Sequence, residues 1–274
     1  MEKNQMNGNK KPKSVFGTRE WAVENFNFIN GCKHDCKYCY SKEMAIRFGR
    51  KEAKTWKIEQ IRENDLNKNV KKKNGIIMFP SSHDITPDHL NESLIVLEKL
   101  LSAGNKVLIV TKPHFECVSK ICKKFTKHKD KILYRFTISS SESSILKFWE
   151  PGAPSFEERV KSLKYAYQLG FQTSVSCEPM LDFNIDKLIN LILPYITDSI
   201  WIGKANYLLK RIKTNGIIDR ESIREATKLV KWQSNKDNII NIYKRHKDNK
   251  KIKWKDSIKK TLKLERPDKK GLDI

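Results

Sequence analysis

The sequence has no hydrophobic run long enough to cross a membrane. Its long apolar stretches, such as residues 93–104, are broken by charged residues well short of the roughly 20 residues that a spanning helix needs. This pattern and a hydrophobic fraction of 38% exclude a membrane protein. The charged N-terminus is followed by no apolar segment of the secretory kind, so we expect a cytoplasmic protein in a reducing compartment.

Acidic residues are scarce relative to basic ones. The chain has 55 Lys and Arg against 32 Asp and Glu, a net charge of +23. This excess of positive charge is expected of a protein that binds nucleic acid. It is also expected of an ordinary solvated surface in this chain, because a composition rich in Lys, Asn and Ile is typical of an AT-biased genome. Residues 204–274 hold 22 Lys and Arg against nine Asp and Glu. Aromatic residues lie among these charges, namely Tyr207, Trp232, Tyr243 and Trp254. Their presence means that DNA or RNA remains a candidate partner of this region.

Short strand-like runs alternate with longer helical patterns through most of the chain. Strands are expected at residues 22–29, 75–79, 106–111, 132–139, 172–177 and 199–203. Helices are expected at residues 57–67, 88–103, 115–127, 155–169 and 185–193. Six such units in series predict parallel strands with right-handed crossovers. The fold class is therefore α/β, either an open, partial (β/α)6 TIM-like barrel or a doubly wound sheet.

Three regions are expected along the chain. Residues 1–14 are interpreted as a disordered basic arm, residues 15–205 as the α/β domain, and residues 206–274 as a basic, mostly helical C-terminal extension. In both candidate architectures, functional groups collect where the strands end. The expected strand ends here carry polar or sulfur-bearing residues, at 30–40, 80–84, 111–114, 139–143, 177–180 and 203–206.

The one cysteine cluster lacks a fourth cysteine. Cys32, Cys36 and Cys39 fall within eight residues, and His34 is too tightly placed between two of them to complete a zinc site. The other three cysteines are scattered and are interpreted as buried thiols: Cys117, Cys122 and Cys177. Three thiolates on a 4Fe-4S cluster would leave one iron open, and an open coordination position is typical of a catalytic metal site.

The Cys-x3-Cys-x2-Cys spacing after a first strand, followed by an aromatic residue, resembles the radical S-adenosylmethionine (SAM) superfamily. The resemblance covers about residues 15–204. It implies the partial barrel, with Cys32, Cys36 and Cys39 holding a 4Fe-4S cluster whose fourth iron SAM chelates. It also implies one-electron cleavage of SAM to a 5′-deoxyadenosyl radical that abstracts hydrogen from a substrate, with a one-electron donor such as flavodoxin or ferredoxin as a partner.

Within that superfamily, four segments resemble the spore photoproduct lyase-like group. They are "CKYCY", "PSSHDITPDHL", "LIVTKPH" and the run from residue 150 to residue 181. The resemblance implies that Tyr38 flanks the nucleoside of SAM, that Tyr40 faces the substrate, and that Lys112 contacts SAM. It also implies cofactor roles for polar residues at the ends of the second and fourth expected strands, which are Ser81, Ser82, Asp84, Ser139 and Ser140. His83 lies beside Asp84 in the sequence and shares its candidate role. For Asp84 and His83, capping of the next helix is the alternative.

One residue departs from the lyase pattern. The lyase carries a cysteine that quenches the product radical shortly before its Ser-Asp segment, and Ser81 stands there in this chain. A serine O–H bond is too strong to donate hydrogen readily to a carbon radical, so thymine-dimer repair is not carried over from the resemblance, and Cys177 at the end of the fifth strand is the candidate replacement for the donor. Two other classes stay open: a zinc-stabilised nucleic-acid-binding module, and an Fe-S electron-transfer or regulatory protein without SAM chemistry.

Overall fold

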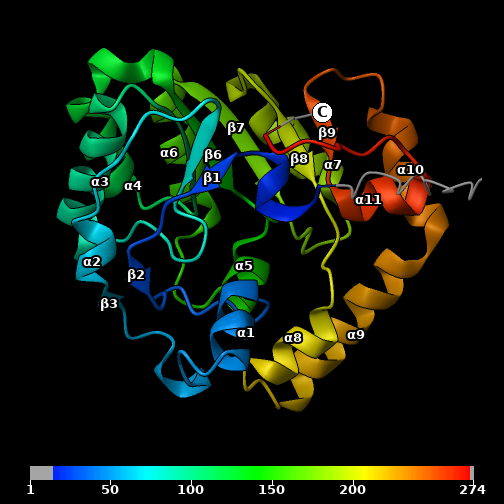
Figure 1. The fold of residues 1–274 in the computed structure, drawn as a ribbon. Helices are drawn as coiled ribbons and strands as arrows, with labels where there is room; N and C mark the ends of the chain where they lie inside the picture. Colours follow the sequence, from blue (N-terminus) through cyan, green and yellow to red (C-terminus); the bar gives the residue numbers. More distant parts are fainter. Residues whose placement is uncertain (1–14, 272–274) are drawn as a thin grey trace, which may run out of the picture.

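A computed structural model describes residues 15–271 of the protein, so the basic arm expected at residues 1–14 lies outside the described residues. Its centre is a seven-stranded sheet in the order β1-β4-β5-β6-β7-β8-β9, with every neighbouring pair parallel (Figure 1). The strands are β1 (Glu24–Asn25), β4 (Ile76–Phe79), β5 (Lys106–Thr111), β6 (Ile132–Thr137), β7 (Gln172–Cys177), β8 (Ile200–Ile202) and β9 (Ile252–Trp254). A separate antiparallel pair joins β2 (Ile29–Asn30) to β3 (Gln60–Ile61).

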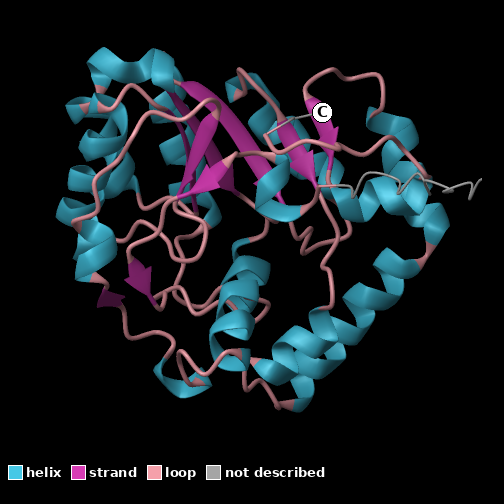
Figure 2. Ribbon diagram, viewed as in Figure 1, coloured by secondary structure: helices cyan, strands magenta, loops and turns pink. Residues whose placement is uncertain are grey.

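Helices connect the strands and extend the C-terminal part (Figure 2). The crossovers contain α3 (Leu90–Ser102), α4 (Phe115–Lys124), α5 (Ser143–Trp149), α6 (Phe156–Gln168) and α7 (Ile185–Ile192). The remaining α-helices are α1 (Tyr40–Arg47), α2 (Glu63–Leu66), α8 (Leu208–Thr214), α9 (Arg220–Ser234), α10 (Lys236–His246) and α11 (Asp256–Leu262). Short 3-10 turns are η1 (Gly17–Glu20), η2 (Ala53–Thr55), η3 (Pro87–His89), η4 (Thr126–Lys131) and η5 (Leu193–Tyr195).

The two faces of the sheet have different coverings. Alternate strand residues, such as Ile109 and Val175, pack in one large core with α3, α4, α6 and α7. The residues between them face inward, where Leu108 and Trp201 pack with Trp21 from the N-terminal segment. Because these four crossover helices share one core on one face, the sheet is a partial (β/α) barrel rather than the doubly wound alternative.

Three expectations differ from the structure. The strand expected at residues 22–29 is two short strands, β1 and β2, which pair in different sheets. The helix expected at residues 57–67 gives way to β3 and the single turn α2, because Gln60 and Ile61 pair with β2. The C-terminal extension is mostly helical as expected, but it also supplies β9, which pairs with β8 at the edge of the sheet. Within residues 15–271, no helix is long and apolar enough to span a bilayer.

Candidate active site

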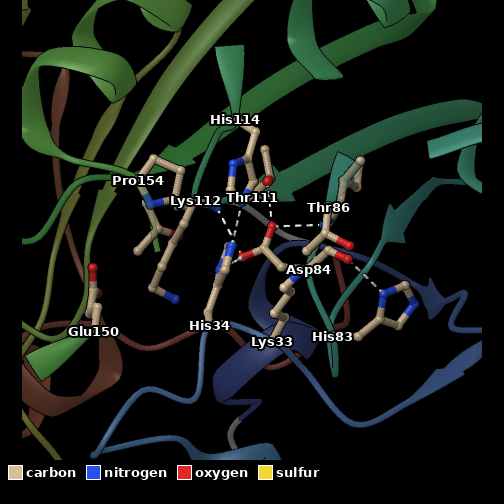
Figure 3. A network of polar contacts seen from close by, with 12 residues as sticks. Lys33, His34, His83, Asp84, Thr86, Thr111, Lys112, His114, Glu150 and Pro154 are labelled. Atoms are coloured by element: carbon tan, nitrogen blue, oxygen red, sulfur yellow. Dashed lines mark hydrogen bonds and ion pairs between the residues drawn. The ribbon is translucent and has the colours of Figure 1, made fainter. Parts of the chain in front are cut away.

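The candidate site lies at the carboxyl edge of the sheet, where the loop after β2 meets the segments that leave β4, β5 and β6 (Figures 1 and 3). This cysteine loop, residues 31–39, ends where α1 begins. Gly152, which follows α5, donates its backbone N–H to the carbonyl of His34 at 3.0 Å. A Cβ atom on Gly152 would lie 2.3 Å from another carbonyl oxygen of the loop, so the close approach of the two segments requires glycine.

The three cysteines of the loop are shielded from solvent. Cys32 and Cys36 are 9% and 5% exposed, Cys39 is partly buried, and none forms a disulfide. Burial is the main cause of the raised pKa of all three thiols, and the other two sulfurs raise the pKa of Cys32 further. Lys112 opposes this at Cys36 and Cys39 by favouring their thiolates. Bound iron would supply the additional positive charge that three neighbouring thiolates need.

Asp84, at the end of β4, is the centre of a buried polar network (Figure 3). Its carboxylate lies 3.1 Å from His34 Nδ1, and it accepts hydrogen bonds from the Thr111 hydroxyl and, at 3.1 Å, from the Lys112 backbone N–H. His34 Nε2 in turn lies 2.9 Å from His114 Nε2. Burial alone would raise the Asp84 pKa, but His34, Lys112 and Thr111 outweigh it and hold that pKa well below its usual range. Asp84 therefore stays ionised and ties the cysteine loop to the ends of β4 and β5.

Tyr38 belongs to a second buried network. Its hydroxyl donates to Glu150, whose carboxylate is also paired with Arg159, and both charged residues are fully buried. The Lys112 ammonium lies 5.8 Å from the centre of the Tyr38 ring. Burial would lower the Lys112 pKa, but the acidic groups around it, Cys36 first among them, raise that pKa well above its ordinary value. A protonated lysine thus extends from the end of β5 to the cysteine loop.

Two serines at the end of β6 are fully buried. Ser140 Oγ accepts the Glu142 backbone N–H at 2.9 Å, but Ser139 Oγ has no hydrogen-bond partner within residues 15–271. Leaving a buried hydroxyl unpaired costs about 1–3 kcal/mol, so Ser139 is suited to a polar group of a bound ligand.

Ser81 and Ser82 are positioned by Asn27, a residue that the sequence reasoning missed. The Asn27 side-chain oxygen accepts both serine backbone N–H groups, at 2.7 and 2.9 Å, and its nitrogen donates to Ser81 Oγ at 3.0 Å. The asparagine thereby links the segment after β1 to the end of β4. No local pattern around Asn27 signals this role, because its partners lie more than 50 residues away along the chain.

The other residues missed from the sequence are His34, His114, Thr111, Glu150 and Arg159. Glu150 and Arg159 both lie in the run of residues 150–181 that carried the family resemblance. That run could have marked them as candidates, but their spacing does not show that they pair.

Two sequence candidates lie apart from these networks, Tyr40 and Cys177, and His83 lies at the edge of the first, where its Nδ1 is 3.0 Å from the Asp84 carbonyl oxygen. His83 points away from Lys112 in Figure 3; its Nε2 accepts the Phe28 backbone N–H at 3.3 Å, and burial lowers its pKa to about 4. Tyr40 is 44% exposed at the start of α1, and Arg211 of α8 lies 6.0 Å from its ring centre. Cys177 alternates onto the helix-facing side of β7, where it is fully buried in the main core and its thiol donates to a backbone carbonyl at 2.9 Å. Its position does not support a role in quenching a radical inside the barrel.

The site's side chains fit a 4Fe-4S cluster and SAM. Three shielded thiols lie on one loop, the half-buried Lys112 ammonium lies beside them, and the unpaired Ser139 hydroxyl offers a polar contact for a second ligand. Among the described residues, no three His, Cys, Asp or Glu side chains are arranged around a single metal ion. The thiolates of a cubane bind three different irons, so they need not meet at one point.

Comparisons with solved structures show the fold. A spore photoproduct lyase variant matches with a TM-score of 0.54 at 16% identity, over 77% of this chain and 65% of that one. A lyase variant with bound AdoMet and dinucleoside spore photoproduct matches with a TM-score of 0.52 at 17% identity, over 77% and 64%. SuiB of Streptococcus suis, bound to its precursor peptide SuiA, matches with a TM-score of 0.51 at 14% identity, over 89% and 51%.

Two sequence relatives are uncharacterized proteins. One, from Acidianus two-tailed virus, is 28% identical over 176 residues, which cover 60% of this chain and 57% of the relative. The other, from Methanocaldococcus jannaschii, is 28% identical over 157 residues, which cover 57% of this chain and 60% of the relative. The chain therefore spans about three fifths of the length of each.

The family model of the radical SAM superfamily matches residues 26–195, which include the cysteine loop and most of the parallel sheet. Enzymes of this family need a 4Fe-4S cluster, SAM and a reductant. Because the match covers more than half of the chain, this protein belongs to the radical SAM superfamily.

Proposed function

We propose that this enzyme abstracts hydrogen from a nucleic-acid substrate at the carboxyl edge of its partial barrel. The proposal rests mainly on the rim beside the cysteine loop, where the exposed rings of Tyr40 and Tyr207 lie near the Arg211 guanidinium, which also contacts Glu43 at 3.4 Å. Tyr207, just before α8, is 77% exposed, and its carbonyl accepts the Arg211 backbone N–H at 2.9 Å. Exposed rings on which bases stack, with cations for phosphates, are the usual means of binding single strands.

Two further observations support a nucleic-acid substrate. The net charge of +23 favours polyanions through release of counterions from phosphates. A spore photoproduct lyase variant with the same fold has been solved with dinucleoside spore photoproduct. The lyase reaction itself is not proposed, because Ser81 stands where the resemblance implies a hydrogen-donating cysteine.

The cofactor roles are assigned to the residues gathered at the strand ends. Cys32, Cys36 and Cys39 would hold the cluster, and Tyr38 and Lys112 would lie against SAM, with the remaining candidates beside them: Ser81, Ser82, Asp84, Ser139 and Ser140. When bound, the two cofactors supply reductive cleavage of SAM and a 5′-deoxyadenosyl radical. The protein's part is to hold SAM between the half-buried Lys112 ammonium and the buried hydroxyls of Ser139 and Ser140 and to keep water out.

A small one-electron donor such as flavodoxin or ferredoxin is the proposed reductant. A reducing cytoplasmic compartment fits the proposal, because all six cysteines are free thiols and such compartments keep them so.

The ligand assignment predicts that replacing Cys32, Cys36 or Cys39 by Ala abolishes both cluster binding and SAM cleavage. Iron and sulfide per chain, and 5′-deoxyadenosine formed under dithionite, would be measured after anaerobic reconstitution. Cys117→Ala is the matched control, because this thiol is buried in α4 among apolar side chains and should leave both readouts unchanged. Full cluster content in any of the three loop variants would remove that residue from the ligand set.

The substrate assignment predicts that Tyr207→Ala weakens binding of a labelled single-stranded oligonucleotide by about 1–3 kcal/mol per lost stacked base. Fluorescence anisotropy over a salt series would measure it. Tyr167→Ala is the control, because Tyr167 is a partly exposed tyrosine on α6, where it packs against Tyr195. Equal affinities of the two variants and the wild type for both DNA and RNA would remove nucleic acid as the substrate.

A further inference from the structure

The cysteine loop is attached to the C-terminal extension through one buried side chain, Asn215. Asn215 is the C-cap of helix α8, and Gly216 follows it with a φ of +80° that favours glycine. Asn215 is only 1% exposed. Its backbone N–H caps α8 by donating to the Arg211 carbonyl at 2.8 Å, which leaves the side chain free to reach the loop.

The Asn215 side chain binds two carbonyls of the loop. Its Nδ2 donates to the Lys37 carbonyl and to the Cys39 carbonyl, each at 3.0 Å. These residues flank Tyr38, so one amide group fixes the short segment between the second and third cysteines. The Asn215 oxygen has no hydrogen-bond partner within residues 15–271, so the two bonds to the loop orient the amide.

Other contacts hold the same segment at neighbouring points. The Lys37 backbone N–H donates to the Trp149 carbonyl at the end of α5, at 2.9 Å. The Lys37 ammonium donates to Ser222 Oγ of α9 at 2.8 Å and lies 3.6 Å from the centre of the Phe148 ring. The loop is thus held by contacts with α5, with α9 and with the residue that follows α8.

We propose that Asn215 is a positioning residue for the iron–sulfur cluster. It fixes the separation of Cys36 and Cys39 and directs amide N–H groups at the carbonyl oxygens beside the cluster. This inference rests on the proposed ligation by the cysteine loop. It gives residues 206–274 a role in the chemistry that is separate from nucleic-acid binding.

Two consequences follow from removing the amide. The two carbonyls lose their shared donor in a buried place, so the loop loosens and the cluster dissociates more readily. The carbonyl dipoles are also no longer neutralised, so adding an electron to the cluster becomes harder and its reduction potential falls. Residues that orient metal ligands typically change metal affinity about 10–100-fold when replaced.

The experiment compares full-length wild type, Asn215→Ala and Asn238→Ala after anaerobic reconstitution. Asn238 is a matched control, because its amide also donates to a backbone carbonyl, that of Trp232 at 2.9 Å, but within the extension. The readouts are the rate of cluster loss to an iron chelator and the midpoint potential of the cluster. Asn215→Ala should lose its cluster about tenfold faster and have a lower potential, while Asn238→Ala matches the wild type.

Other outcomes have distinct meanings. Wild-type protein that binds no cluster contradicts the proposed function, whereas a stable wild-type cluster with identical behaviour in Asn215→Ala contradicts the role of Asn215. Should the alanine variant fail to fold, Asn215→Ser keeps one donor and must fall between the wild type and Asn215→Asp, which has no donor. A potential that is unchanged across this series would overturn the proposal.

Discussion

Glu150 is a buried carboxylate whose ionisation depends on its neighbours. Burial alone would raise its pKa, but Arg159, Lys112 and the Tyr38 hydroxyl more than offset this, so the Glu150 pKa is lowered in the folded protein. The Arg159 guanidinium also donates to the Pro154 carbonyl at 2.9 Å and the Thr137 carbonyl at 3.1 Å. The Glu150–Arg159 pair therefore connects the segment after α5 to the end of β6, next to Tyr38.

Replacing Glu150 by Gln should destabilise the fold by about 3–5 kcal/mol at neutral pH, because Arg159 would be left as a buried charge without its partner. Denaturant unfolding would measure this. A folded-state pKa below the unfolded one means that the ionised carboxylate stabilises the fold above the unfolded pKa of about 4.5. That contribution is lost as pH falls through the lower, folded pKa.

The control for this prediction is Glu98→Gln, which breaks an exposed ion pair with Lys124 (N···O 3.2 Å) and should cost less than about 1 kcal/mol. The wild type should lose more stability than Glu150→Gln when the pH is lowered below 4.5. Parallel pH profiles for the two proteins would show that Glu150 is not ionised in the fold.

For individual strands and helices, the local sequence pattern predicts the bounds correctly where neighbouring residues begin and end the element. The strands at residues 106–111 and 172–177 were predicted with the observed bounds, because each is a short run between turn residues. Helix α6 was predicted within one residue, because Ser155 caps its first turn through a bond to the Glu158 N–H and Gly170 follows its end.

Elements set by distant partners could not be predicted in this way. Strand β9 has three residues and exists because it pairs with β8, about 50 residues earlier in the chain. Likewise, β3 pairs with β2 across the cysteine loop, within a stretch that has a helical pattern of its own. Pairing with a partner outweighs local propensity in such short segments.

The candidate site likewise combines residues that a local sequence pattern identifies with residues that only the fold brings together. The cysteine spacing is local, so the candidate ligands could be named from the sequence. Glu150 is 112 residues from Tyr38, and Asn215 is 176 residues from Cys39. Only the fold brings such pairs together, so their roles could not be inferred from spacing.

At the scale of the whole molecule, the sheet is an open barrel whose edge strands, β1 and β9, do not pair with each other. The N-terminal segment before β1 lies across this opening (Figure 1). Lys255, directly after β9, is 1% exposed and pairs there with Glu20 at 2.9 Å and with Glu178 at 3.5 Å. Its ammonium also lies 3.9 Å from the ring centre of Trp21. One lysine therefore joins the C-terminal edge of the sheet to the N-terminal segment.

Lys255→Met should accordingly lower the free energy of unfolding of the whole domain by about 3–5 kcal/mol, because it leaves the buried Glu20 carboxylate without its cation. Adding Glu20→Gln should recover part of the loss, since the uncompensated charge is then gone. Lys260→Met is the control: it removes an exposed ammonium from Asp256 (2.7 Å), which keeps Arg266 as a second partner at 2.6 Å, and it should cost less than about 1 kcal/mol. Equal midpoints of urea unfolding for the two single variants would mean that Lys255 does not close the barrel.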